Sequence, residues 1–135
     1  MKKKILAIDD SKAIRFLLKT VLQNEFEVIT VPDGCAAMYW LSKRSFPDLI
    51  IADPQLPDMN DWELIDQLSS SVLYKDIPVI ILSSLEAAQT EIKCIEFDIA
   101  RSFTKPFNPL ALLEAVRSIC GSKRTRPALQ IQTAN

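Results

Sequence analysis

The sequence predicts an α/β fold: a three-layer α/β/α sandwich around a five-stranded parallel sheet. Segments with strand-like and helix-like patterns alternate five times along the 135 residues. Strands that alternate with helices pair in parallel through right-handed crossovers. The runs 49–52 and 79–82 are apolar at every position, as expected for strands of a sheet that helices cover on both faces. Together these observations indicate a doubly wound, flavodoxin-like (βα)5 arrangement.

The first half of the chain carries the signals for three strands and two helices. An apolar run over 5–8 is the first expected strand. Ser11 can cap a helix over 12–24, whose apolar residues recur at helical spacing. A short strand is expected over 27–31, and an aspartate–glycine turn then opens the second helix. A break that contains proline separates this helix from the third strand.

In the second half, Pro54 and Pro57 keep the segment after the third strand as a loop, because each removes a backbone donor and restricts its predecessor. A helix is expected over 61–73. After the fourth strand, another helix is expected over 86–97, with an apolar face suited to burial. That face comprises Ala88, Ile92 and Ile95. The fifth strand is expected over 101–104.

The last helix is expected to begin after Asn108, a capping residue. It is expected to end near Gly121, because glycine suits the position that follows a helix. A single domain over 1–121 is large enough to bury a core without disulfides or a structural metal. Residues 122–135 are polar and lack periodicity, which predicts a flexible C-terminal tail.

Composition excludes several classes of function. The net charge of −1 lacks the basic excess of an electrostatic nucleic-acid binder, so no direct nucleic-acid contact is expected. The longest apolar runs are strand-length, so no membrane span is expected. The basic start is followed by too few apolar residues for a signal peptide, and a cytoplasmic location is therefore expected. Cys35, Cys94 and Cys120 are widely spaced and are expected to be reduced.

The chain contains no histidine. This absence excludes histidine-based acid–base catalysis, Ser-His-Asp triads and most zinc sites within the chain. It also means that the chain cannot itself carry phosphohistidine.

Five polar residues follow the carboxyl ends of four expected strands. They are Asp9 and Asp10 after the first strand, Asp53 after the third, Ser83 after the fourth and Lys105 after the fifth. Ligands bind beyond the carboxyl ends of the strands in an open parallel sheet, so these residues are expected to converge. Each alone could be a helix cap, a turn residue or a surface charge. All five together suit a divalent cation and a phosphoryl group.

Four motifs, in their order and spacing, resemble the receiver domain of two-component response regulators over residues 3–121. They are Ile8-Asp9-Asp10-Ser11, Asp48 to Asp53 with Leu56-Pro57-Asp58-Met59, Pro78 to Ser84, and Thr104-Lys105-Pro106-Phe107. The resemblance implies a stand-alone, chemotaxis-regulator-like switch. It also implies that the chain is no enzyme beyond catalysing its own phosphorylation and dephosphorylation.

The resemblance further implies a metal site beside a phosphoacceptor. Asp53 would accept the phosphoryl group. Asp10 would bind Mg²⁺ (or Mn²⁺) directly and Asp9 mainly through water. Asp53 and the backbone carbonyl of Gln55 would complete the protein ligands. Neutralising the charge of the transferring group is what allows a carboxylate to attack phosphorus.

Lys105 and Ser83 would contact phosphoryl oxygens, the first as a point charge and the second as a hydrogen-bond donor. The Lys105-Pro106 bond is a candidate cis peptide. The expected switch residues are Ser83, Ser102 and Phe103. Ser102 stands where receivers usually carry tyrosine or phenylalanine. Phe103 is adjacent, but a one-residue shift on a strand reverses the face of the side chain, so Phe103 is expected in the core.

Other departures from the receiver pattern bear on phosphorylation. Pro54, directly after the phosphoacceptor, removes a backbone donor. Asp61 and Asp98 stand where receivers often carry glycine. Aspartate tolerates the left-handed backbone better than most residues, so the turn at Asp61 is expected to form, whereas Asp98-Ile99 is expected to stiffen the entry to the fifth strand. An apolar Leu85 is expected to orient a hydrolytic water poorly and to slow dephosphorylation.

The expected partners are a histidine kinase or histidine phosphotransfer protein and a downstream effector protein. Too few residues follow 121 for a further domain, so output is expected through protein contact or onward phosphotransfer, from a monomer or weak dimer. The alternative is a degenerate receiver that binds proteins independently of phosphorylation. Pro54 and Ser102 favour this alternative, and the complete set of five site residues opposes it.

Two other classes fit the sequence less well. A haloacid-dehalogenase-type phosphatase places its nucleophile after the first strand in a D-x-D pattern, whereas here the two aspartates are adjacent. A flavodoxin-like cofactor carrier needs a phosphate-cradling loop at that position, and Asp9 and Asp10 would repel the phosphate.

Overall fold

A computed structural model describes residues 1–43 and 45–121. The strands are β1 (Lys3–Ile8), β2 (Phe26–Val31), β3 (Leu49–Ala52), β4 (Val79–Ser83) and β5 (Arg101–Thr104). The helices are α1 (Lys12–Leu22), α2 (Gly34–Ser42), α3 (Glu63–Ser69), α4 (Ala87–Glu96) and α5 (Pro109–Gly121). Within the described ranges, no helix combines the length and the apolar character needed to cross a membrane.

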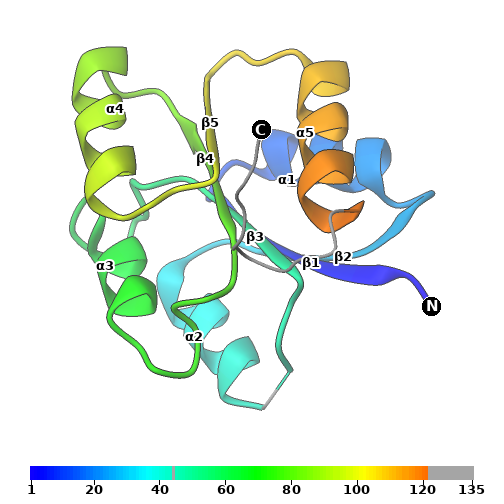
Figure 1. Cartoon of the computed structure of the whole chain (residues 1–135), viewed down its shortest axis with the longest axis horizontal. Coiled ribbons are helices and arrows are strands. Elements are labelled where there is room, and N and C mark those ends of the chain that lie inside the picture. Colours follow the sequence, from blue (N-terminus) through cyan, green and yellow to red (C-terminus); the bar gives the residue numbers. More distant parts are fainter. Residues whose placement is uncertain (44, 122–135) are drawn as a thin grey trace, which may run out of the picture.

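The five strands form one parallel sheet in the order β2-β1-β3-β4-β5. Figure 1 shows α1 and α5 on one face of this sheet, and α2, α3 and α4 on the other. The predicted three-layer, doubly wound (βα)5 fold is therefore confirmed. The strand order reverses between β1 and β3, and ligands bind beyond the carboxyl ends of the strands at such a point.

Alternate residues of the central strands face two separate hydrophobic cores. Ile5 and Ala7 of β1 belong to a core shared with α1 and α5. Leu6 and Ile8 belong to a core shared with α2 and α3. Because both faces are buried, a one-residue slip would move every side chain into the wrong core, and the register is fixed. The carboxyl ends of β1 and β3 are thereby held side by side.

Side-chain caps fix the start of the first and last helices. The Ser11 hydroxyl accepts a hydrogen bond from the Ile14 amide at 3.2 Å. Asn108 Oδ1 accepts bonds from two amides in the first turn of α5, at 2.8 and 3.2 Å. Both predicted caps are confirmed. Gly121 is instead the last residue of α5 and has no left-handed backbone, and the predicted tail over 122–135 lies outside the described residues.

The first turn expected for α3 is not helical, so this helix begins later than predicted. Trp62 has a left-handed φ of 67°, and its amide donates a hydrogen bond to the Pro54 carbonyl at 2.8 Å. The left-handed residue is therefore Trp62 and not Asp61, whereas Asp98 takes a φ of 54° before β5. The buried Trp62 ring stacks on Phe97 with centroids 6.3 Å apart, and this contact helps to hold the strained backbone.

The end of α3 also differs from the prediction. The helix ends at Ser69, four residues before the expected end at 73. In the segment that follows, the Ser71 hydroxyl accepts a hydrogen bond from the Leu73 amide at 3.1 Å. Serine side chains that bond to nearby backbone groups compete with helical hydrogen bonds, so the run of serines stops the helix.

The predicted buried face of α4 is wrong. All three of its residues are exposed, Ile92 to 66% and Ile95 to 79%. The opposite side of the helix packs instead, with Thr90 buried and Cys94 and Phe97 against the core on the α2 and α3 side. An apolar stripe shows that a helix is amphipathic, but it does not show whether the sheet or another molecule covers the stripe.

Candidate functional site

Three carboxylates converge where the sheet order reverses. Asp9 and Asp10 follow β1, and Asp53 follows β3. Each offers an oxygen, and these oxygens all lie within 4.8 Å of one another. The Asp9 and Asp53 side chains are buried, whereas Asp10 is exposed. The predicted convergence of the three aspartates is what the structure contains.

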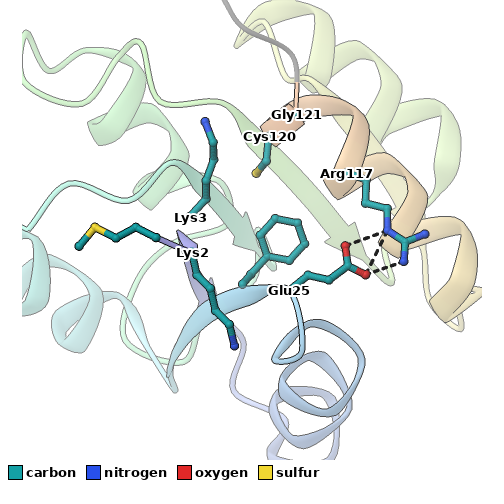
Figure 2. A pocket seen from close by; sticks show the side chains of 8 residues that line it. Lys2, Lys3, Glu25, Arg117, Cys120 and Gly121 are labelled. Atoms are coloured by element: carbon teal, nitrogen blue, oxygen red, sulfur yellow. Dashed lines mark hydrogen bonds and ion pairs between the residues drawn. The ribbon is translucent and has the colours of Figure 1, made fainter.

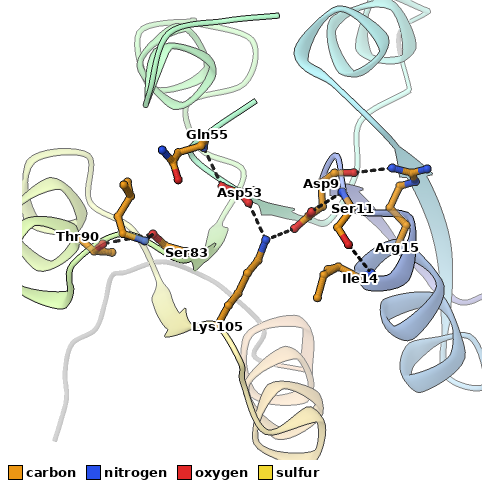
Figure 3. A network of polar contacts seen from close by, with 10 residues as sticks. Asp9, Ser11, Ile14, Arg15, Asp53, Gln55, Ser83, Thr90 and Lys105 are labelled. Atoms are coloured by element: carbon orange, nitrogen blue, oxygen red, sulfur yellow. Dashed lines mark hydrogen bonds and ion pairs between the residues drawn. The ribbon is translucent and has the colours of Figure 1, made fainter. Parts of the chain in front are cut away.

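Lys105 reaches this cluster from beyond the far edge of the sheet. Its Nζ donates to Asp9 Oδ2 at 2.7 Å and to Asp53 Oδ2 at 2.6 Å, so one ammonium bridges both buried carboxylates (Figure 3). The lysine side chain is only 15% exposed, and water therefore screens these ion pairs weakly. The Lys105-Pro106 peptide bond is cis, as predicted.

The second oxygen of each buried carboxylate is held by a backbone amide. Asp9 Oδ1 accepts a bond from the Ser11 amide at 2.9 Å, and Asp53 Oδ1 accepts one from the Gln55 amide at 2.8 Å. Both carboxylates are thus fixed in orientation before any ligand arrives. Within the described ranges, the Asp10 carboxylate takes part in no hydrogen bond or ion pair, so its oxygens are free to bind a cation.

The two buried charges of the pair respond to opposing influences. Burial raises the pKa of Asp53, more than the hydrogen bond from Lys105 lowers it, and the negative charge of Asp9 raises it further. Burial alone would lower the pKa of Lys105, but its bonds to Asp53 and Asp9 leave that pKa raised. Three carboxylates and one ammonium give the cluster a net negative charge, which favours a cation.

Ser83 ends β4 and belongs to the same edge of the sheet. Its carbonyl accepts a bond from the Lys105 amide at 2.8 Å. Its buried hydroxyl accepts a bond from the Leu85 amide at 2.9 Å and lies 3.5 Å from the hydroxyl of Thr90. Sequence reasoning identified Ser83 but missed Thr90. The available signal was a hydroxyl within the fourth helix, in line with Cys94 and opposite the apolar stripe.

The two candidate switch residues on β5 point in different directions. Phe103 is half-buried against the core beneath α1 and α5, as predicted, and the Arg101 guanidinium lies 5.2 Å from its ring centre. Ser102 is exposed on the other side of the strand. Burial raises the pKa of the Cys94 thiol on α4, and a hydrogen bond from Ser102 partly opposes this shift. Ser102 therefore faces α4.

A second hollow lies at the opposite, amino-terminal end of the sheet (Figure 2). It has a volume of about 510 Å³. The residues that line it are Met1, Lys2, Lys3, Glu25, Phe26, Arg117, Cys120 and Gly121. Burial raises the pKa of the Cys120 thiol to about 11, so this thiol stays protonated and unreactive at neutral pH. The hollow contains none of the predicted site residues.

The family of the chain follows from the match over this fold and site. The family model described as the response regulator receiver domain matches residues 5–117. The chain belongs to this family. Receiver domains act in two-component systems, so phosphorylation-dependent signalling is the general activity of the fold found here.

Named relatives include both long and short regulators. The chain is 33% identical to "Regulatory protein VanRc" of Enterococcus gallinarum over 87% of its length, which is 50% of that protein. It is 26% identical to a "Chemotaxis protein CheY homolog" of Campylobacter jejuni, covering 88% of this receiver and 93% of that protein. The chain thus spans about half the length of the first of these relatives and most of the second.

A solved structure similar to this receiver contains a metal. The Mn²⁺-bound form of response regulator Rcp1 has a TM-score of 0.77 and 29% identity, over 93% of this chain and 99% of that one. Mn²⁺ and Mg²⁺ both prefer oxygen ligands. The donor set here, three converging carboxylates, is of the type that such cations require.

Proposed function

We propose that this receiver accepts a phosphoryl group on Asp53 and so acts as a phosphorylation-dependent signalling switch. The observation that carries the proposal is the Lys105 ammonium, whose Nζ lies 2.6 Å from Asp53 Oδ2. Asp9 and Asp10 lie beside the same carboxylate. A nucleophilic carboxylate with a fixed cation and metal-binding carboxylates next to it has the parts that phosphoryl transfer to aspartate requires.

Asp9, Asp10, Asp53 and the backbone carbonyl of Gln55 are the proposed ligands of Mg²⁺ or Mn²⁺. The oxygen donor set and the net negative charge of the cluster support this assignment. When bound, the cation neutralises charge on the transferring phosphoryl group. Burial of Asp9 and Asp53 strengthens their electrostatic contribution, and exposure of Asp10 leaves room for the waters that Mg²⁺ retains.

Asp53 is the proposed nucleophile. One of its carboxylate oxygens bonds to phosphorus while the bond between phosphorus and the donor's imidazole nitrogen breaks. The electron pair of that bond stays on the imidazole, which then takes up a proton. Lys105 neutralises one phosphoryl oxygen, and Ser83 donates a hydrogen bond to another. The donor is a histidine kinase or phosphotransfer protein, because this chain has no histidine of its own.

Output is proposed to pass by contact with a downstream effector protein or by onward phosphotransfer, from a monomer or weak dimer in the cytoplasm. The exposed side chains Ile92 and Ile95 on α4 support protein contact, because apolar residues that gather on one exposed face mark interaction sites. This helix directly follows the loop that starts at Ser83, so a change at the phosphoryl group has a short path to that face.

A degenerate receiver that binds proteins without phosphorylation is the second candidate. Pro54 favours it, because the residue after the phosphoacceptor has no N–H to offer a phosphoryl oxygen. Exposed Ser102 also favours it, since a serine replaces the usual aromatic switch. The intact ion pairs of Lys105 with Asp9 and Asp53 weigh against it.

Intact-mass spectrometry after incubation with acetyl phosphate and Mg²⁺ tests the proposal. The expected result is one phosphoryl adduct on the wild-type chain, absent from Asp53→Asn and after chelation of the metal. Asp66→Asn, at an exposed position on α3, is the matched control and should keep the adduct. A folded wild-type chain without any adduct would favour the phosphorylation-independent binding module.

A further inference from the structure

The hydroxyl of Ser83 is directed toward α4 and is in contact with a second buried hydroxyl. Ser83 and Thr90 are 1% and 6% exposed, and their hydroxyl oxygens lie 3.5 Å apart (Figure 3). Thr90 is the only buried residue of α4, a helix that the structure describes throughout. The buried contact between this helix and the site is therefore a polar one.

The Ser83 hydroxyl has one proton to give. The Leu85 amide already donates to its oxygen at 2.9 Å, so the proton is what Ser83 offers to other groups. In the state described here, the nearest hydroxyl is that of Thr90. Within the described ranges Thr90 Oγ1 has no other hydrogen-bond partner, and a buried hydroxyl without a partner is costly. A phosphoryl oxygen on Asp53 would compete with Thr90 for the same proton.

We infer that Thr90 is a positioning residue that holds the Ser83 hydroxyl toward α4 until a phosphoryl group draws it away. This inference rests on the proposed function, because it needs a phosphoryl group on Asp53. When Ser83 donates to a phosphoryl oxygen, its proton leaves Thr90, and the amino-terminal half of α4 loses its buried polar tie to β4. The hydrogen bond that is exchanged connects the site to the helix.

The rest of α4 makes this exchange consequential. Its carboxyl-terminal end is anchored, because Cys94 and Phe97 pack on the core and Phe97 stacks on Trp62. Its outer face carries the exposed Ile92 and Ile95. Release at Thr90 therefore lets the helix move about its anchored end and shifts the apolar face. Ser102 carries no ring that could perform this coupling from β5.

The test is the affinity for beryllofluoride, a phosphoryl mimic, titrated in the presence of Mg²⁺ and followed by amide NMR shifts of the full chain. Thr90→Val keeps the shape of the side chain and removes the hydroxyl. Since the competing partner of Ser83 is gone, this variant should bind beryllofluoride about two- to fivefold more tightly, as expected for loss of one long neutral hydrogen bond. Thr90→Ser should restore the wild-type affinity. Thr20→Val, the same change at an exposed position on α1, should have no effect.

A double-mutant cycle separates positioning from general packing. In a Ser83→Ala background, Thr90→Val should leave the affinity unchanged, because there is no serine proton to hold. Equal affinities of wild type and Thr90→Val, or the same gain in both backgrounds, would overturn the inference while leaving the proposed function intact. If Thr90→Val does not fold, Thr90→Ala carries the same expectation. A folded wild type that binds no beryllofluoride would overturn the proposed function instead, and this inference with it.

Discussion

The helices α4 and α5, which precede and follow the edge strand β5, are held in different ways. α5 buries four residues in the core, with Leu112 at 0% exposure. α4 buries Thr90 alone and exposes Ile92 and Ile95. Segments with few buried apolar contacts open and move at a low free-energy cost. The contrast places stability on the α5 side of the domain and freedom to respond on the α4 side.

The same contrast passes through the site. Lys105, just before α5, bonds to Asp9 and Asp53 at 2.7 and 2.6 Å. Ser83, just before α4, meets Thr90 at 3.5 Å. Short ion pairs hold the charged half, and a long hydrogen bond holds the hydroxyl half. A group that bonds to both halves would change the weaker one first.

The largest expected effect compares the two helices directly. Leu112→Ala removes a fully buried side chain from α5 and should lower the free energy of unfolding by about 3 to 4 kcal/mol. Ile92→Ala trims an exposed side chain of α4 and should change it by less than about 0.5 kcal/mol. Urea denaturation of both variants measures the difference. Comparable losses would mean that α4 is held as firmly as α5.

A somewhat smaller effect is expected from the charged half of the site. Lys105→Ala leaves two buried carboxylates without their cation and should cost about 2 to 3 kcal/mol of unfolding free energy. Lys93→Ala is the matched control, because it breaks only an exposed pair with Glu96 at 3.4 Å, worth about 0.5 kcal/mol or less. Equal losses in the two variants would show that the bridging ammonium adds no stability.

The pH dependence of that loss has a definite sign. The bonds from Asp53 and Asp9 outweigh burial and raise the pKa of Lys105 above its ordinary 10.5 in the folded state. Its contribution is therefore present below 10.5 and is lost as the pH rises through the folded value. Denaturation at neutral and alkaline pH should show the gap between wild type and Lys105→Ala persisting to pH 10. A gap that closes near pH 8 would contradict this expectation.

The smallest effect is expected at the phosphoacceptor, and it has the opposite sign. Burial raises the pKa of Asp53 above its ordinary 3.8, so the ionised side chain destabilises the folded state as the pH rises through and above that value. Asp53→Asn removes this charge and should stabilise the domain by about 1 kcal/mol at neutral pH. The gain should vanish near pH 3 in thermal unfolding. A loss of stability at neutral pH would show that the bond from Lys105 outweighs burial.

The fold and the charged half of the site could be predicted because each rests on a local pattern with one solution. Apolar runs such as 49–52 form buried strands, and polar residues at strand ends converge when the strands are parallel. Caps such as Ser11 and Asn108 were equally local. The assignment of Asp53, Lys105 and the remaining residues to chemical roles stays a prediction, which the mass measurement tests.

The errors in prediction share a physical cause: each depends on a contact between distant segments. The apolar stripe with Ile92 and Ile95 reads as a buried face until the packing of the opposite side is known. The left-handed turn falls on Trp62, because its buried ring and its bond to Pro54 outweigh the local preference for Asp61. Thr90 acquires its importance only from its distance to Ser83, and no local pattern gives that distance.

Amide hydrogen exchange tests most directly the claim that α4, and not α5, responds to the phosphoryl group. Exchange would be compared for peptides over 84–97 and 109–121, in Mg²⁺ alone and in Mg²⁺ with beryllofluoride, with Asp53→Asn as the control. The account predicts a change of protection in 84–97, none in 109–121, and none in either segment of the control. Equal changes in both segments, or a change confined to 109–121, would contradict it.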